Sequence, residues 1–292
     1  MSSRAPAKTL DAIWFVTPAI AVVAQRRGLF AARGIEMRST QTSSSDEQYD
    51  ALANGTCYVA VTAMDNVIGW NRRKPGDFRI VAQIEATTPL TLVARPDITA
   101  LSDLVGRKIL VDSPDNGFVV VLHALLADAG VDFQANRIVR AGGVRERLNK
   151  LLAGEGDATL LGPPFEAMAA EAGMRALASV NALYPAFPGQ GVVVRQETVA
   201  HSADLLASWL AALEEARSLG RDHPEKTRDD LIAAGFSAPS ARGLVAGIGS
   251  TLIPDRQGVN LLIAQRGRVG LPGAEVTYEE IVDARFLSGT RG

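Results

Sequence analysis

The residues best able to do chemistry in this sequence are carboxylates that follow short apolar segments: Asp65, Glu85 and Asp115. Asp65 stands beside Asn66, and this pair could accept from a ligand amine or hydroxyl and also donate from the amide. Asp is equally a preferred helix N-cap, so a purely structural role for Asp65 stays open. Glu85 follows the apolar run 78–84 and is a candidate general base by its position.

The composition excludes several other classes of site. The chain has 292 residues with 30 Lys and Arg against 32 Asp and Glu, and a net charge of −2 provides no basic surface for nucleic acid. Its single cysteine, Cys57, excludes an internal disulfide, and we interpret it as a small buried residue rather than a nucleophile. The three histidines are scattered, and His123 is interpreted as a core-edge residue, so we expect neither a metal site nor a cofactor.

The length predicts about two domains, and short apolar strands alternate with helices as in βαβ units. The predicted strands cover 10–15, 34–38, 58–61, 78–84, 90–94, 109–111, 138–139 and 158–161. The predicted helices cover 17–28, 44–52, 118–130, 144–154, 164–173, 202–219, 224–234, 259–265 and 276–286, and a further helical turn begins at 67–70. Ser44 with Glu47, and Thr277 with Glu280, have the spacing of a capping box.

The apolar segment 12–24 could be mistaken for the core of a signal peptide. It contains Pro18, is followed at once by Gln-Arg-Arg-Gly at 25–28, and is too short to span a bilayer. We therefore expect a buried strand that leads into a helix with Thr17 as N-cap and Pro18 in its first turn. On this interpretation the sequence shows no export signal and no transmembrane segment.

Small and polar residues gather where the predicted strands end and helices begin. In an open parallel sheet these positions meet in one crevice, and helix N-termini there present unpaired backbone N–H groups. Several such termini could hold an anion without an Arg or Lys, although each residue could also be only a helix cap. The pattern favours capture of a small molecule over catalytic turnover.

Four segments resemble one known family. The segment 102–109, Ser-Asp-Leu-Val-Gly-Arg-Lys-Ile, resembles its "DLxGKxI" element, and 24–35 resembles its first helix and second strand. The segments 52–62 and 152–164 resemble its two "L-x-x-G-x-x-D-A" elements, although the first has Thr-Cys-Tyr where an acidic residue is usual. The family is the sulfonate, nitrate, taurine and thiamine-pyrimidine-precursor type of ABC transporter substrate-binding protein.

The resemblance implies an α/β, type II periplasmic-binding-protein fold. Each lobe would be a mostly parallel sheet flanked by helices, and two crossover strands would join the lobes so that they close over a ligand. The expected division is 1–94 with 190–292 for the first lobe and 95–189 for the second, with the ligand cleft between them.

The resemblance also implies a set of ligand contacts from both lobes. Strand alternation sends Trp14 and Phe15 to opposite faces, and we expect Phe15 to supply the apolar wall. The implied contacts are Phe15, Thr17, Thr42, Ser43, Ser44, Met64, Asp65 and Asn66 from the first lobe, and Ser113, Asn116, Gly117, Gly143 and Pro164 from the second.

The expected function is non-catalytic binding of a small organic ligand, anionic or aromatic, by the solute-binding protein of an ABC uptake system. Its partners would be that ligand and an ABC permease, and we expect a monomer or weak dimer. Two alternatives stay open: a cytosolic enzyme on the same fold, with desulfinase- or decarboxylase-like acid–base chemistry, and a cytosolic ligand sensor. The compartment would be periplasmic if an export signal has been removed and cytoplasmic if Met1 is the native start.

Overall fold

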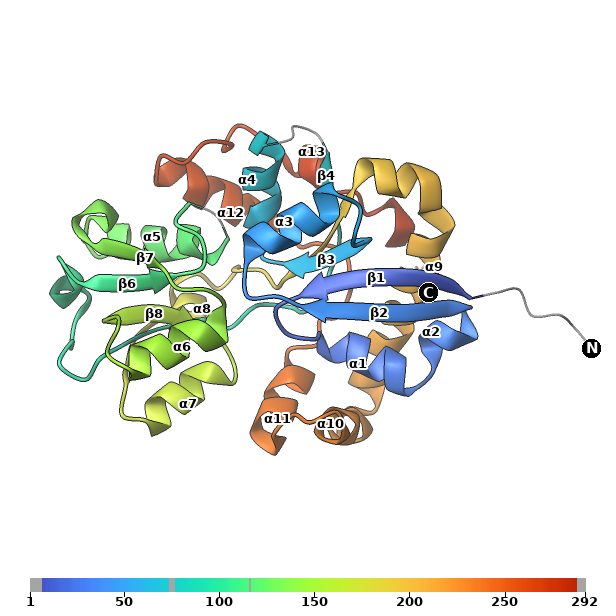
Figure 1. Ribbon diagram of the computed structural model, residues 1–292, viewed down its shortest axis with the longest axis horizontal. Coiled ribbons are helices and arrows are strands. Elements are labelled where there is room, and N and C mark those ends of the chain that lie inside the picture. The colour runs from blue at the N-terminus through green and yellow to red at the C-terminus, as the bar shows by residue number, and fades with distance from the viewer. Residues whose placement is uncertain (1–6, 74–76, 116, 288–292) are drawn as a thin grey trace, which may run out of the picture.

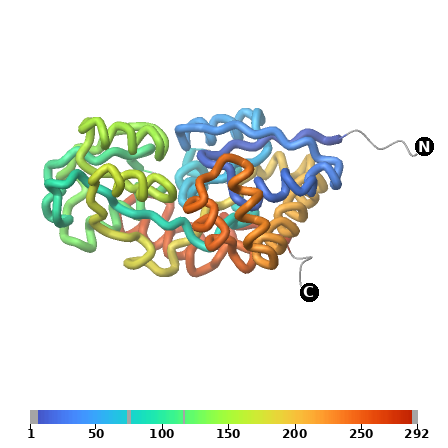
Figure 2. Tube along the Cα trace, turned by 90° about the horizontal axis from the view of Figure 1, so that it is seen from below, coloured from blue at the N-terminus to red at the C-terminus, as the bar shows by residue number. Residues whose placement is uncertain are grey.

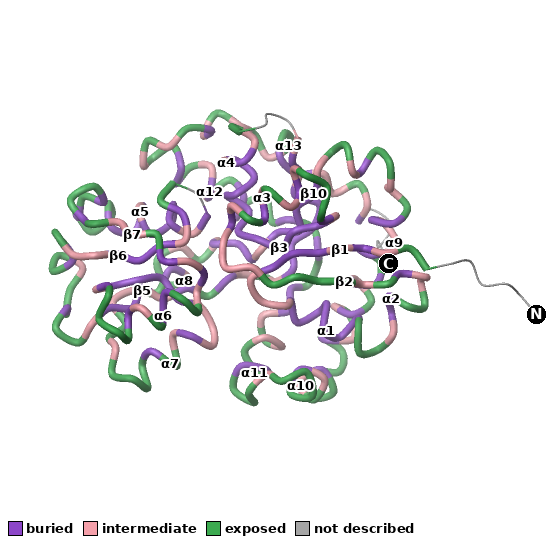
Figure 3. The backbone as a smooth tube through the Cα atoms, in the orientation of Figure 1, coloured by how far each residue is buried: buried purple, intermediate pink, exposed green. Residues whose placement is uncertain are grey.

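The computed structural model describes residues 7–73, 77–115 and 117–287. They form two lobes side by side, each built on a five-stranded sheet that helices cover (Figure 1). Most of the strands are buried within their lobes (Figure 3). No helix within the described residues combines the length and the apolar character needed to cross a membrane.

The first sheet has the order β2-β1-β3-β10-β4. β1 pairs in parallel with both β2 and β3, whereas β10 runs antiparallel to its neighbours β3 and β4. Along β1, Leu10, Ala12 and Trp14 face one hydrophobic cluster and Ile13 faces another, as alternation along a strand requires. The strands are β1 Lys8–Trp14, β2 Ile35–Gln41, β3 Val59–Thr62, β4 Phe78–Gln83 and β10 Gly191–Arg195.

The second sheet has the order β7-β6-β8-β5-β9 and repeats this arrangement. β6 pairs in parallel with β7 and β8, and β5 runs antiparallel to β8 and β9. In each sheet the reversed strand is the one that the chain enters after crossing from the other lobe. The strands are β5 Thr91–Ala94, β6 Lys108–Val111, β7 Arg137–Arg140, β8 Ala158–Leu161 and β9 Arg175–Ser179.

Helices cover both sheets and extend the first lobe at its C-terminal side. Between them lie short 3-10 turns at Leu101–Leu104, Phe133–Ala135 and Arg285–Leu287. The helices are α1 Ala19–Arg26, α2 Leu29–Ala32, α3 Ser45–Ala53, α4 Asp65–Arg73, α5 Phe118–Asp128, α6 Val144–Leu152, α7 Phe165–Glu171, α8 Val180–Leu183, α9 Gln196–Asp222, α10 Pro224–Ala233, α11 Ala238–Ala246, α12 Arg256–Arg268 and α13 Tyr278–Ile281.

Two chain crossings join the lobes, and α12 packs against both lobes. The first crossing lies between β4 and β5 and the second between β9 and β10, and the backbone N–H of Ile84 donates to the carbonyl of Gln190 at 2.9 Å. α12 packs against α4 of the first lobe and α5 of the second. One hydrophobic cluster accordingly contains Leu262 of α12, Ile68 of α4 and Leu125 of α5. Figure 2 shows the C-terminal part of the chain reaching toward the second lobe.

The sheet pairing bears on where the lobes divide. β5 pairs with β8 and β9, so residues 91–94 lie in the second sheet although the expected division counts them with the first lobe. We propose the two-lobe division with its first crossing between Gln83 and Thr91 and its second between Ser179 and Gly191.

Several elements differ from those predicted. β9, β10 and α11 are absent from the prediction, and the predicted helix 276–286 is only the single turn of α13, with its capping box of Thr277 and Glu280 present. At the start of α1 the N-cap position is held by Pro18 rather than Thr17, and no side chain caps it. Ser44 does cap α3, whereas Glu47 contacts the hydroxyl of Thr42 instead of closing a capping box.

Candidate functional site

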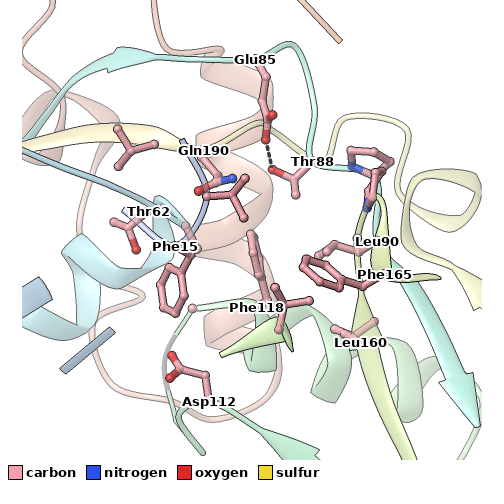
Figure 4. A pocket seen from close by; sticks show the side chains of 18 of the residues that line it. Phe15, Thr62, Glu85, Thr88, Leu90, Asp112, Phe118, Leu160, Phe165 and Gln190 are labelled. Carbon is pink, nitrogen blue, oxygen red and sulfur yellow. Dashed lines mark hydrogen bonds between the residues drawn. The ribbon is translucent and has the colours of Figure 1, made fainter. Parts of the chain in front are cut away.

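A cavity of about 400 Å³ lies between the two sheets and is lined by residues of both lobes. Its walls come from the loop after β1, the ends of β3 and β8, the two crossings, the loop after β6, the C-terminal end of α11, and the first turns of α1, α4, α5, α6 and α7. The side chains that line it are mostly apolar, as in pockets that bind small organic molecules (Figure 4).

Three phenylalanines supply the aromatic part of the wall. Phe15 comes from the first lobe, and Phe118 and Phe165 come from the first residues of α5 and α7 in the second lobe. Phe118 packs against Phe187 of the second crossing, with ring centroids 6.2 Å apart. Trp14 is only 2% exposed and belongs to the core of the first lobe, so Phe15 alone of the neighbouring pair faces the cavity.

The crossings place a carboxylate at one end of the cavity. Glu85 from the first crossing and Gln190 from the second both line it, and the hydroxyl of Thr88 donates to Glu85 Oε1 at 2.7 Å. Burial raises the pKa of Glu85, and hydrogen bonds with Thr88 and Gln190 partly offset that increase.

The opposite end carries Asp112 of the second lobe. Arg147 of the same lobe also lines the cavity and lies near enough to Asp112 for its charge to act on that carboxylate. Ser45 of the first lobe donates its hydroxyl to Asp112 Oδ2 at 2.6 Å, so this carboxylate also contacts the other lobe. Burial raises the pKa of Asp112, and the hydrogen bond from Ser45 and the charge of Arg147 act against the increase.

The guanidinium of Arg147 is buried and donates within its own lobe. It donates to Thr159 Oγ1 at 3.1 Å, to the carbonyl of Gly142 at 3.0 Å and to the carbonyl of Leu160 at 3.3 Å. Burial lowers its pKa to about 10, and the nearby Asp112 opposes that shift. Arg147 therefore fixes the end of β8 against the start of α6 at the cavity wall.

A second set of buried polar contacts joins the lobes beside the cavity. Asp65 Oδ2 accepts from Arg266 Nη1 at 2.7 Å and from the backbone N–H of Gly117 at 3.0 Å. Arg266 also donates to the carbonyl of Asp115 at 3.3 Å. Burial raises the pKa of Asp65 to about 6, against the lowering effects of Arg266 and Gly117.

Residues 17–227 match the family model described as NMT1/THI5 like. The chain belongs to the NMT1/THI5-like family. None of the curated proteins matches it.

Solved structures of low sequence identity share the fold of this NMT1/THI5-like protein. The ligand-binding component of an ABC-type import system from Staphylococcus aureus, with zinc bound, is 12% identical, with a TM-score of 0.79 over 96% of this chain and 98% of that one. The alkanesulfonate-binding protein SsuA from Xanthomonas axonopodis pv. citri, bound to MOPS, is 16% identical, with a TM-score of 0.75 over 96% of this chain and 100% of that one. The nitrate-binding protein NrtA from Synechocystis PCC 6803 is 13% identical, with a TM-score of 0.77 over 97% of this chain and 88% of that one. The predicted type II periplasmic-binding-protein fold is confirmed.

The structure gathers some of the predicted contact residues of this NMT1/THI5-like chain around one cavity. Those that line it are Phe15, Thr17, Asn66, Ser113 and Gly117. Asn116 lies outside the described residues. The predicted residues that are not among the lining residues are Thr42, Ser43, Ser44, Met64, Asp65, Gly143 and Pro164.

Most of the predicted residues that do not line the cavity have a structural role elsewhere. Met64 is 2% exposed and packs in the hydrophobic cluster that both lobes share. Thr42 and Ser44 order the turn before α3, and Pro164 holds the N-cap position of α7. A Cβ on Gly143 would stand 3.1 Å from the Cα of Ser43, so these two residues mark a close approach of the backbones.

Of the three carboxylates considered for acid–base chemistry, Glu85 lines the cavity, whereas Asp65 and Asp115 do not. Cys57 is buried, and burial and Asp11 raise the pKa of its thiol, which makes it a poor nucleophile. Across the described part of the chain, no cluster of three His, Cys, Asp or Glu could hold a metal ion.

Several cavity residues are not among the contacts predicted from the sequence, namely Asp112, Phe118, Arg147, Phe165 and Gln190. Asp112 directly follows the predicted strand 109–111, so its position was a usable signal. Gln190 precedes Gly-Val-Val-Val, an apolar run typical of a buried strand. Arg147 offered a signal as well, because it shares the apolar helix face of Val144, Leu148 and Leu151.

Proposed function

We propose that this chain is the solute-binding component of an ABC-type uptake system and holds a small organic ligand of aromatic or anionic character between its lobes. The observation that carries the proposal is the mostly apolar cavity of about 400 Å³ between two lobes that are joined by two chain crossings. Such an arrangement lets lobes move apart for entry and close over a ligand. An ABC permease would be the partner that receives it.

The energetics suit a ligand of modest size. Micromolar affinity requires roughly 8 kcal/mol. Burial of an aromatic body against Phe15, Phe118 and Phe165, with a few hydrogen bonds at the polar ends, is of this order after the cost of association. The named relatives support the proposal, since they include binding proteins for alkanesulfonate and nitrate.

The test is a ligand screen with two readouts. Purified protein is mixed with small aromatic compounds, carboxylates, sulfonates and amines, and thermal unfolding and X-ray scattering are measured. A ligand should raise the unfolding temperature, and Phe118→Ala should weaken its affinity by more than about tenfold because a large part of the apolar wall is lost.

Leu183→Ala is the matched control, since Leu183 is 51% exposed and is not a lining residue. It should leave ligand affinity unchanged. The proposal fails if no compound of the four classes stabilises the wild-type protein.

A further inference from the structure

We propose that Glu85 makes the cavity selective for aromatic ligands that carry a protonated amine, with the carboxylate of Glu85 pairing with that ammonium group. This inference rests on the proposed function and names the chemical class of ligand. The charges of the lining residues, the position of Glu85 and the contacts of Arg147 each support it.

The charged residues among the described lining residues are Glu85, Asp112 and Arg147. The guanidinium of Arg147 donates three hydrogen bonds, to Thr159, Gly142 and Leu160, so three of its donors already have partners within the protein. Asp112 lies close enough to Arg147 for each to shift the pKa of the other, and it also accepts from Ser45. Their charges largely compensate at that end of the cavity.

Glu85 has only neutral partners. Its recorded hydrogen-bond partners are Thr88 and Gln190, and within the described part of the chain no Lys, Arg or His forms an ion pair with it. A carboxylate accepts up to about four hydrogen bonds, so Glu85 retains capacity for a donor on a ligand. An uncompensated charge in a mostly apolar cavity is costly unless it is paired.

The backbone holds Glu85 firmly at its end of the cavity. The carbonyl of Glu85 accepts from Gln83 Nε2 at 2.9 Å, and the N–H of the next residue, Ala86, donates to the carbonyl of Gly247 at 3.0 Å. A Cβ on Gly189 would lie 2.0 Å from the Glu85 carbonyl oxygen, so the two crossings touch here. The carboxylate is therefore presented from a fixed point and not from a mobile loop.

The aromatic side chains lie between this carboxylate and the opposite end. In Figure 4, Glu85 and Asp112 stand at opposite ends of the view, and Phe15 and Phe118 lie between them. A ring held by these side chains could direct an amine toward Glu85. An acidic group placed there would instead meet a carboxylate of like charge.

The experiment compares three probes of similar size: phenethylamine, 2-phenylethanol and 3-phenylpropionate. Isothermal titration calorimetry at pH 7.5 measures each affinity for the wild type, for Glu85→Gln and for Glu155→Gln, whose side chain is exposed and outside the cavity lining. The wild type should bind the amine about 10- to 100-fold more tightly than the alcohol, as expected for a hydrogen bond to a charged group. Glu85→Gln should remove that preference by lowering the amine affinity more than the alcohol affinity, and Glu155→Gln should leave the preference unchanged.

The outcomes separate this inference from the proposed function. Binding of the alcohol or the acid as tightly as the amine by the wild type overturns the amine selectivity and leaves the solute-binding role in place. An equal loss of amine and alcohol affinity in Glu85→Gln also overturns it. Failure of all three probes to bind the wild type counts against both. The wild-type comparison stands on its own if the variant does not fold.

Discussion

Arg266 near the C-terminus places Nη1 2.7 Å from Oδ2 of Asp65, and the two side chains are only 3% and 1% exposed. Because Asp65 Oδ2 also accepts from the N–H of Gly117, this ion pair connects α12 and α4 with the start of α5. The ligand contact expected of Asp65 stays a prediction, and in the structure this carboxylate makes the interlobe contact. The sequence offered no signal for the pairing, since the two residues are 201 positions apart.

Removing one member of this pair should strongly destabilise the protein. Asp65→Ala leaves the buried guanidinium of Arg266 without its carboxylate, and such a loss typically costs about 3–5 kcal/mol in the free energy of unfolding. Urea denaturation followed by circular dichroism measures the change. Glu275→Ala is the control, because its partner Arg72 is 55% exposed and Glu275 itself 64% exposed, and exposed pairs contribute only about 0–1 kcal/mol. Equal costs for both variants would contradict this account.

The hydroxyl of Ser45 should favour the closed arrangement of the lobes. Ser45→Ala removes its hydrogen bond to Asp112 across the cleft, and we expect ligand affinity to fall by up to about tenfold. Ser44→Ala is the neighbouring control: it removes the cap of α3 and should cost about 1 kcal/mol of unfolding free energy with little effect on affinity. Calorimetric titration and urea denaturation distinguish the two. A similar loss of affinity in both variants would refute the assignment.

The raised pKa of Glu85 predicts a pH-dependent stability difference in the ligand-free protein. Because burial favours the protonated form in the folded state, the stability of the wild type relative to Glu85→Gln should be greatest below the ordinary pKa of 4.5 and should fall as the pH rises through the higher folded value. Denaturation of both proteins between pH 4 and 8 measures this difference. A difference that is constant with pH, or that favours the wild type at higher pH, would rule it out.

A methyl group on Gly143 should hinder the approach of the lobes. The added Cβ would lie 3.1 Å from Ser43 Cα and 2.9 Å from Glu146 Oε2, whereas the backbone φ of −66° suits alanine. We expect Gly143→Ala to weaken ligand binding more than it lowers the free energy of unfolding. X-ray scattering should show a larger radius of gyration for the ligand-bound variant than for the wild type. An unchanged radius and affinity would show that the two backbones do not limit closure.

The alternation of strands and helices was readable from the sequence because buried strands such as Ala158–Leu161 are short apolar runs between glycines and polar turns. β9 was not, since Arg175–Ser179 is mostly exposed and lacks an apolar run. The prediction of a helix over 276–286 was wrong because the backbone becomes extended at Val282. There a β-bridge to Ile80 takes the place of helical hydrogen bonds.

The sequence predicts a cavity residue correctly where that residue closely follows a strand that ends at the cleft. Phe15 and Ser113 line the cavity because each follows a strand that ends at the cleft. Thr42 and Ser44 follow a strand as well, but their local hydrogen bonds turn the chain into α3. Arg147 stands on the apolar face of its helix and Gln190 precedes an apolar run, but packing between elements distant in the sequence decides that both line the cavity.

The packing of α12 against both lobes limits how the two lobes can separate. Since Leu262 packs in a cluster that includes Leu125 and Ile68, separation on that side would expose continuous apolar surface to water. Ser45 of α3 and Asp112 of the second lobe meet instead through hydrogen bonds, which water can replace when the lobes separate. We therefore expect an opening motion that keeps α12 packed against α4 and α5 to cost less free energy than one that separates them.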